Sequence, residues 1–158
     1  MPFPYQILPL AEAHLPQIMA IERSVFDKPW SMSLMKDSLI SAHTQGWGIF
    51  DEYHHLLAFV LVSVIFDEAE ILDISVSKEY QNQGFGQKLL AFLLNHLAYK
   101  GVEKLFLEVG VNNKPALAIY RKYGFKQLLI RKDYYINSDN STEDAIVMQA
   151  VLQPQTKG

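Results

Sequence analysis

The sequence is organised around the stretch from Ile71 to Leu90, which reads ILDISVSKEYQNQGFGQKLL. An apolar segment is followed by a short polar turn, and two glycines, Gly84 and Gly86, stand at the start of an amphipathic run. This order predicts a strand, a tight turn and the beginning of a helix. The first turn of a helix has N–H groups without an intrahelical acceptor, and the helix dipole adds partial positive charge there. Because glycines let a phosphate approach the backbone closely, the stretch predicts an anion-binding site.

The length and composition predict one globular domain. The chain has 158 residues, of which 49% are hydrophobic and 20% are charged, so a packed core is expected rather than disorder. We expect the domain to span residues 1–152 and a flexible tail to follow over residues 153–158. The absence of cysteine excludes disulfides, thiolate metal sites and a cysteine nucleophile. The histidines show no metal-ligand spacing, so we expect no metal site.

The lack of targeting signals and the distribution of charge limit where the protein is expected to act and what it is expected to bind. No secretory signal is apparent, and the longest mostly apolar run, Leu56–Phe66, is far shorter than the roughly 20 residues of a membrane helix. We therefore expect a soluble cytoplasmic protein without a membrane partner. The net charge is −3, yet residues 78–132 contain ten Lys or Arg against three Asp or Glu. This distribution fits an anionic ligand or ordinary surface charge, and the overall acidity argues against nucleic-acid binding.

Hydrophobic periodicity predicts a mixed α/β chain in the order β-α-α-β-β-β-α-β-α-β-β, with several antiparallel strands. Pro16 falls in the first turn of the first helix, where proline is tolerated, and Ser31 can cap the second helix. Glu22 lies on the apolar stripe of the first helix, which makes it an unusual carboxylate. The expected strands are residues 5–10, 46–50, 57–66, 70–77, 104–109, 125–131 and 145–152; the expected helices are residues 13–26, 31–40, 84–99 and 113–123; residues 51–55 form a hairpin turn and residues 137–142 a polar loop.

Gln81, Gly84 and Gly86 form the pattern Q-x-x-G-x-G. Such a pattern also occurs in plain turns, so it indicates phosphate binding only through its context, an apolar strand before it and an amphipathic helix after it. It differs from the dinucleotide fingerprint G-x-G-x-x-G, and no Lys-Ser/Thr pair follows it as in a P-loop. A nicotinamide cofactor and nucleotide hydrolysis are therefore disfavoured.

A second group of polar residues lies in and after the expected strand 104–109. Glu108 interrupts an otherwise apolar strand, either as a strand-end residue or, if it faces a cleft, as a general base. Asn113 stands where a helix begins, so capping is its simplest role. Tyr120 lies about two turns into that helix, where it either packs in the core or presents its hydroxyl as a proton donor. The sequence leaves both alternatives open for Glu108 and Tyr120.

Together the two groups resemble the GNAT superfamily of N-acetyltransferases, in which Q/R-x-x-G-x-G/A holds the pyrophosphate of acetyl-CoA. The resemblance covers nearly the whole chain. It narrows to the bacterial enzymes that acetylate the N-terminal alanine of a small-subunit ribosomal protein, the eighteenth in the standard naming. The matching positions are Glu22 and Phe26 before Pro29-Trp30-Ser31, Leu107-Glu108-Val109, Asn113, Tyr120, Gly124-Phe125, Arg131, Tyr134-Tyr135 and residues 143–148.

The resemblance implies a single-domain acyl-CoA N-acyltransferase fold with a central, mostly antiparallel mixed sheet flanked by helices. It also implies acetyl-CoA as the co-substrate. Ile74, Ser75 and Val76 match the strand whose backbone pairs with the pantetheine arm. Asn113 matches a residue that contacts the cofactor. The residues that match the pyrophosphate loop are Asn82, Gln83, Gly84, Phe85, Gly86 and Gln87.

For the catalytic step, the resemblance implies that Glu108 is the general base and that Tyr120 is the general acid for the departing thiolate. Two positions depart from the family pattern. Gly110 stands where the family usually has Arg, and Asn112 stands where it usually has Ser. Both lie beside the implied base, so they bear on recognition of the acceptor rather than of acetyl-CoA.

These features predict acetyl transfer from acetyl-CoA to the N-terminal alanine of a ribosomal protein, by direct attack in a ternary complex because no cysteine can carry the group. Acetylation of a lysine side chain or a small amine is an alternative, and a non-catalytic acyl-CoA-binding regulatory module is another. Glu108 and Tyr120 favour an enzyme, since a pure binder needs neither. Tyr134 and Tyr135 either pack in a strand or line a groove for the acceptor peptide. The oligomeric state is left open, and a monomer is compatible with the sequence.

Overall fold

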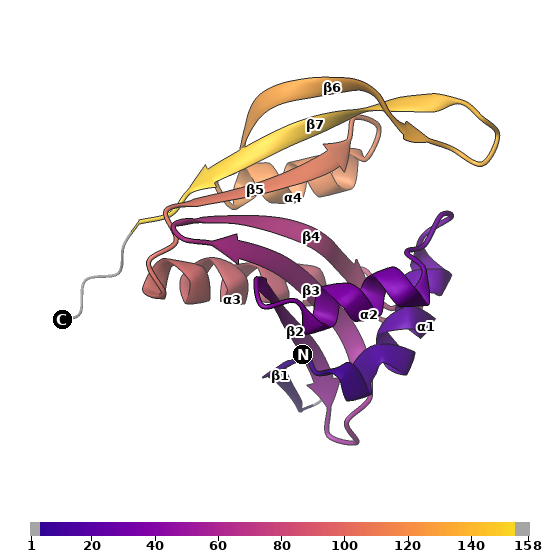
Figure 1. Ribbon diagram of the computed structural model, residues 1–158, viewed down its shortest axis with the longest axis vertical. Helices are drawn as coiled ribbons and strands as arrows, with labels where there is room; N and C mark the ends of the chain where they lie inside the picture. The colour runs from indigo at the N-terminus through magenta and orange to yellow at the C-terminus, as the bar shows by residue number, and fades with distance from the viewer. Residues whose placement is uncertain (1–3, 154–158) are drawn as a thin grey trace. The chain divides into compact units, whose positions relative to one another are not determined.

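The computed structural model describes residues 4–153, which form a mixed β-sheet with flanking helices (Figure 1). Over these residues the sheet has seven strands in the order β1-β2-β3-β4-β5-β7-β6. Strands β4 and β5 pair in parallel, whereas the pairs β1–β2, β2–β3, β5–β7 and β6–β7 are antiparallel. The predicted fold class and order of elements are confirmed. The strands are β1 Tyr5–Pro9, β2 Thr44–Asp51, β3 Leu56–Ile65, β4 Glu68–Val76, β5 Lys104–Gly110, β6 Lys126–Ile136 and β7 Thr142–Val151; the helices are α1 Leu15–Val25, α2 Met32–Ile40, α3 Phe85–Tyr99 and α4 Lys114–Lys122; Glu12–His14 and Lys78–Tyr80 are 3-10 turns.

The elements divide into two compact units by their contacts. The first unit contains the chain up to Ser63 together with Leu72–Phe92, and the second unit contains Val64–Ile71 together with the chain from Leu93 onward. None of the helices within residues 4–153 is long and apolar enough to cross a membrane. The single domain expected over residues 1–152 stays a prediction, and most of the expected tail, residues 154–158, lies outside the described residues.

Helices α1 and α2 supply much of the core of the first unit. Pro16 stands in the first turn of α1, where its missing N–H leaves no helical bond unmade. The Ser31 hydroxyl accepts a hydrogen bond from Leu34 N–H at 3.1 Å and caps α2, as the sequence predicts. The buried residues of this core, which come from α1, α2, β2 and β3, are Leu15, Ile18, Met19, Ile21, Met35, Phe50, Leu56, Phe59 and Leu61.

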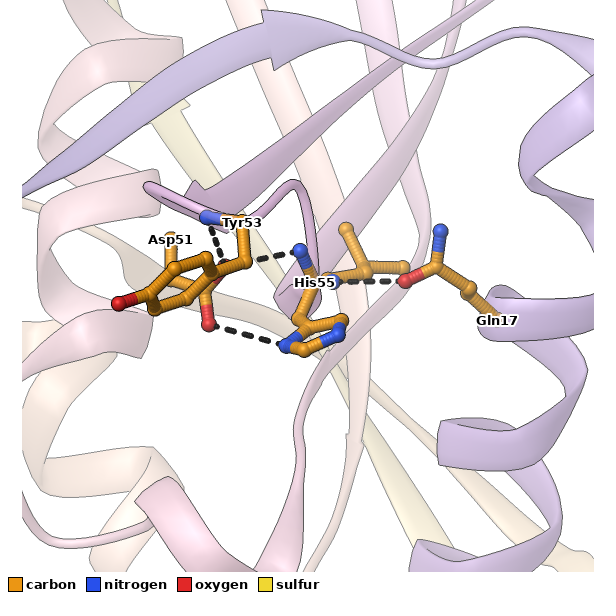
Figure 2. A network of polar contacts seen from close by, with 5 residues as sticks. Gln17, Asp51, Tyr53 and His55 are labelled. Carbon is orange, nitrogen blue, oxygen red and sulfur yellow. Dashed lines mark hydrogen bonds and ion pairs between the residues drawn. The ribbon is translucent and has the colours of Figure 1, made fainter.

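One carboxylate holds the turn between β2 and β3 (Figure 2). Asp51 Oδ1 accepts hydrogen bonds from the backbone N–H groups of Tyr53 and His55, each at 2.9 Å, and Asp51 Oδ2 lies 3.3 Å from His55 Nδ1. Gln17 Oε1 of α1 accepts a further hydrogen bond from Leu56 N–H at 2.8 Å. The predicted hairpin turn is confirmed, and its bond to α1 fixes where β3 enters the core.

The second unit is built on the antiparallel pairs of β5 with β7 and of β7 with β6. Side chains alternate along β5, so that Leu105, Leu107 and Val109 are buried while Phe106 and Glu108 are only partly buried. Successive side chains of a strand point to opposite faces. Glu108 therefore lies on the face of β5 opposite to the core residues.

Strand β6 is longer than the sequence indicates. The strand expected over residues 125–131 continues to Ile136, and β7 begins earlier than expected, at Thr142. The register between β6 and β7 shifts around Asp133, whose φ of 54° is left-handed. Hydrogen bonding to β7 thus carries the strand past Lys132 and Asp133, which disfavour strands, and it resumes at Tyr135, whose residue type favours a strand.

Candidate active site

Strand β4 presents two different faces where the sequence predicts the pantetheine-binding segment. Asp73 and Ser75 are buried, whereas Ile74 and Val76 on the other face are partly exposed. The Ser75 hydroxyl donates a hydrogen bond to Asp73 Oδ1 at 3.1 Å. The Ser75 side chain is therefore engaged in the interior of the first unit, and a ligand on the exposed face of β4 would meet the backbone of this residue.

The loop between β4 and α3 combines left-handed backbone with hydrogen bonds from its glutamines to preceding carbonyl groups. Asn82 has a φ of 62° and Gly84 has a φ of 86°. Gln81 Nε2 donates to Val76 O at 3.1 Å, and Gln83 Nε2 donates to a carbonyl oxygen of the preceding 3-10 turn at 3.2 Å. The glutamine side chains of the pattern thus hold the loop against the segment from which it leaves the sheet.

Gly84 at the end of the loop and Gly86 in the first turn of α3 leave space beside the backbone. A Cβ on Gly84 would meet no other part of the described chain within 4 Å, chain neighbours aside. A Cβ on Gly86 would meet only Val76 Cγ2, at 3.5 Å, which is an ordinary contact distance. The loop therefore has room for a group that approaches the backbone closely, and its place before a helix of 15 residues suits an anionic group.

Phe85, between the two glycines, serves a different purpose from its neighbours. It is 1% exposed, and its ring packs edge-on against the rings of Tyr5 and Tyr80, with centroids 5.8 and 6.1 Å away. Its side chain anchors the start of α3 in the core. A ligand contact of Phe85 is thereby limited to its backbone.

Glu108 lies in a polar group within the second unit. Glu108 Oε1 is 3.5 Å from Arg131 Nη1 of β6, and the Glu108 side chain is 18% exposed. Tyr134 donates a hydrogen bond to Glu108, and the Arg131 guanidinium carbon lies 5.3 Å from the centroid of the Tyr134 ring. The carboxylate predicted as the base thus has a cation and a phenol as partners.

Three neighbours of Glu108 have raised pKa values. Burial, followed by the charge of Glu108, raises the pKa of Tyr135 to about 12. The hydrogen bond to Glu108 raises the pKa of Tyr134, and burial together with the nearby charge of Glu108 raises the pKa of Glu70. Both tyrosines therefore stay protonated at neutral pH and can donate hydrogen bonds. Glu70 is a second carboxyl group in the neighbourhood of Glu108.

Helix α4 carries the other two residues predicted in this unit. Asn113 Oδ1 accepts a hydrogen bond at 3.4 Å from the backbone N–H three residues later, which confirms its capping role. Tyr120 is partly buried, and its ring packs edge-on against Phe125 with 5.7 Å between the centroids. Tyr120 also contributes to the raised pKa of Tyr135, so these two tyrosines and Glu108 share one electrostatic neighbourhood.

The glycine at position 110 leaves room for a carboxylate over the turn after β5. Glu143 Oε2 accepts a hydrogen bond from Asn112 N–H at 2.9 Å. A Cβ on Gly110 would collide with that same oxygen. The two positions that depart from the family pattern are thus linked through Glu143.

The predicted residues fall into two groups. The first unit holds Ile74–Val76 and Asn82–Gln87, and the second unit holds Glu108, Asn113 and Tyr120. Sequence reasoning missed Glu70, because its closeness to Glu108 depends on the parallel register that pairs Glu70 with Phe106. Over residues 4–153 no group of three or more His, Asp or Glu side chains could hold a metal ion.

Comparisons with known proteins point to one family. The model of the acetyltransferase (GNAT) family matches residues 15–125. A ribosomal protein bS18-alanine N-acetyltransferase of Haemophilus ducreyi is 31% identical over 143 residues, which cover 90% of this chain and 97% of that protein. The protein of the same name from Escherichia coli K12 is 35% identical over 143 residues, which cover 88% of this chain and 92% of that protein. The crystal structure of the ribosomal-protein-S18-alanine N-acetyltransferase from Escherichia coli matches with a TM-score of 0.91 at 31% identity and covers 98% of both chains.

Replacing Gly110 with alanine should displace the Glu143 carboxylate from Asn112 N–H, because the new methyl group and the carboxylate cannot occupy the same place. We expect the free energy of unfolding to fall by about 1 kcal/mol, the usual net value of one hydrogen bond. Urea denaturation of Gly110→Ala measures the loss. In a Glu143→Ala background the obstacle is absent, so the same change should cost much less there. Equal losses in the two backgrounds would contradict the link.

Proposed function

Since the chain belongs to the acetyltransferase (GNAT) family, we propose that it transfers the acetyl group of acetyl-CoA to the amine of an N-terminal alanine, with ribosomal protein bS18 as the acceptor. The observation that carries the proposal is the identity of 31% and 35%, over 90% and 88% of the chain, with two proteins named for that reaction. The polar groups around Glu108 and the open loop before α3 support it, because acetyl transfer needs both a proton acceptor and a phosphate-binding backbone.

The first unit offers groups that fit acetyl-CoA, the co-substrate of GNAT enzymes. The backbone of Ile74–Val76 would bond the pantetheine arm, and the N–H groups of Asn82–Gln87 would bond the pyrophosphate. The space beside Gly84 and Gly86 supports this assignment, because a side chain there would stand where phosphate oxygens approach. Asn113 is proposed as a further contact. When bound, acetyl-CoA supplies an acyl group activated as a thioester.

Glu108 is proposed as the general base. An α-amine has a pKa of roughly 7.7–8.0, so most of it is protonated at neutral pH and cannot attack a thioester. Glu108, directly or through water, accepts the proton that the amine must lose. Arg131 Nη1, 3.5 Å from the carboxylate, supplies a counter-charge that an incoming ammonium group would share or replace.

Tyr120 is proposed as the general acid. Its hydroxyl donates the proton that the leaving sulfur needs when the new N–C bond forms and the C–S bond breaks. The edge-on contact with Phe125 restricts the orientation of the Tyr120 ring. The chain has no cysteine that could carry the acetyl group, so direct transfer to the amine is favoured.

A panel of acceptors tests the proposed function by intact-mass measurement. The panel contains the bS18 N-terminal peptide beginning with alanine, the same peptide with its α-amine blocked, a peptide whose only free amine is a lysine, and a small amine. Acetylation of the free N-terminal alanine alone supports the proposal. Acetylation of lysine or of the small amine alone would overturn the acceptor, and binding of acetyl-CoA without any product would indicate a binding module.

Tyr120→Phe should lower kcat by roughly 10²–10⁴-fold, because it removes the proposed proton donor and keeps the ring. The Kd for acetyl-CoA should change little. Tyr123→Phe makes the same change three residues later and should leave kcat near the wild-type value. A wild-type kcat in Tyr120→Phe would reject the role of this hydroxyl.

Glu108→Gln should lower the rate at neutral pH, since the amide cannot accept the proton of the amine, by roughly 10²–10⁴-fold. Above about pH 8 the amine is largely deprotonated without help, so the deficit should narrow. A pH–rate profile of the variant and of the exposed control Glu52→Gln measures this. A profile of Glu108→Gln that runs parallel to wild type would count against the base.

Gly86→Ala tests the phosphate approach without crowding the protein, because its Cβ would meet only Val76 at an ordinary 3.5 Å. We expect the Kd for acetyl-CoA to rise about tenfold or more, a change of about 1.4 kcal/mol, while the fold is kept. Gly84→Ala differs, because a φ of 86° disfavours any side chain, so stability should also fall, by about 1 kcal/mol. Wild-type affinity in Gly86→Ala would mean that the loop does not hold the pyrophosphate.

A further inference from the structure

Two carboxyl groups meet in the interior of the first unit. Glu22 of α1 is 1% exposed, and Asp73 of β4 is 7% exposed. Neither residue belongs to the groups proposed above to bind or transfer the acetyl group. Asp73 nevertheless directly precedes Ile74–Val76, the segment proposed to bond the pantetheine arm.

Each of the two carboxyl groups has one oxygen with a donor and one without. Trp30 N–H donates to Glu22 Oε2 at 3.0 Å, and the Ser75 hydroxyl donates to Asp73 Oδ1 at 3.1 Å. The remaining oxygens, Glu22 Oε1 and Asp73 Oδ2, are buried and receive no N–H or O–H from the described part of the chain. Two buried and unpaired carboxylate oxygens would be costly, so a further proton is required here.

A proton shared between the two side chains meets this requirement. Asp73 hydrogen-bonds the side chain of Glu22, and two carboxylate oxygens can do so only when one of them carries a proton. Burial, followed by the hydrogen bond and the charge of Glu22, raises the pKa of Asp73 to about 9, against the opposing effect of the Ser75 hydroxyl. At neutral pH Asp73 therefore carries the proton, and the pair holds one negative charge instead of two.

We propose that Asp73 is a positioning residue, which as a carboxylic acid donates a hydrogen bond to Glu22 and so joins the connection between α1 and α2 to the strand segment that binds acetyl-CoA. The bonds run from Trp30 N–H through Glu22 and Asp73 to the Ser75 hydroxyl. Because the Ser75 side chain is held toward the interior, the side chains of Ile74 and Val76 stay on the opposite face of β4. The effect on acetyl-CoA rests on the proposed function, whereas the shared proton does not.

The pair is a proton-binding site rather than an ion pair. The groups that act on Asp73 are Glu22 from α1 and Ser75 from its own strand, and no Lys, Arg or His of the described residues contributes. The pKa of Asp73 rises from 3.8 to about 9 on folding, so between these values the folded protein holds one proton more than the unfolded chain. The contribution of the pair to the free energy of unfolding is therefore full below pH 3.8, falls steadily as pH rises above it, and is lost once pH passes about 9.

Asp73→Asn removes this titration and keeps the hydrogen bond, because the asparagine N–H can donate to Glu22. Urea denaturation of wild type and variant between about pH 5 and pH 8 should give a ratio of unfolding constants, wild type to variant, that rises about tenfold per pH unit, since the two proteins differ by one bound proton. Asp37→Asn, an exposed control on α2, should give a constant ratio. A constant ratio for Asp73→Asn would overturn the proposal.

Glu22→Gln is the mirror variant. The glutamine amide can accept from Trp30 N–H through its oxygen and donate to Asp73 through its nitrogen. The variant removes the charge and the hydrogen bond of Glu22 that help to raise the pKa of Asp73, whereas burial, the largest cause, stays. The side-chain carboxyl carbon of Asp73, followed by NMR, should therefore titrate below its wild-type midpoint. An unmoved midpoint in folded Glu22→Gln would contradict the shared proton.

Asp73→Ala removes the donor altogether and tests the positioning role. We expect the Kd for acetyl-CoA to rise at least tenfold in Asp73→Ala and to return close to wild type in Asp73→Asn, with kcat at saturating acetyl-CoA less affected than KM. Wild-type affinity in folded Asp73→Ala, or lost affinity in folded Asp73→Asn, would overturn that role. If wild-type protein binds no acetyl-CoA at all, the proposed function fails, while the pH dependence of stability still decides on the proton.

Discussion

The alternation of side chains along β4 is the constraint on which the rest of the structure depends. Asp73 and Ser75 are buried on one face, whereas Ile74 and Val76 are partly exposed on the other. A shift of the pairing by one residue would exchange the two faces. It would bring the polar pair to the surface and turn the proposed acyl-CoA segment inward. The register of β4, more than any single side chain, therefore gives the first unit both its buried carboxyl pair and the partly exposed face proposed to bind acyl-CoA.

The chain uses carboxyl groups in two different environments. Glu108 is compensated by the Arg131 guanidinium and by a hydrogen bond from Tyr134, and its side chain keeps contact with solvent. Asp73 meets another carboxyl group in the interior and is compensated by a proton. A carboxylate of the first kind can exchange a proton with a substrate, whereas one of the second kind retains its proton as part of the fold.

Local signals predicted the elements, and tertiary contacts explain what sequence reasoning missed. The order of helices and strands, the Ser31 cap and the Asn113 cap depend on neighbours within a few residues, so periodicity and residue type were sufficient. The full extent of β6, the closeness of Glu70 to Glu108 and the Glu22–Asp73 pair depend on strand register and on helix placement. The carboxylate over Gly110 likewise comes from a residue 33 positions away, on the neighbouring strand β7.

Strand β6 lies at one edge of the sheet, and the irregularity in its backbone bears on self-association. Its side chains are almost all exposed, including those of Leu128, Leu129 and Ile130. An apolar edge of this kind is a template on which a strand of another molecule can pair. Directly after the apolar run, the ladder shifts and the backbone turns left-handed at Asp133. The regular part of the edge therefore ends before Asp133, which shortens the stretch on which a strand of another molecule could pair.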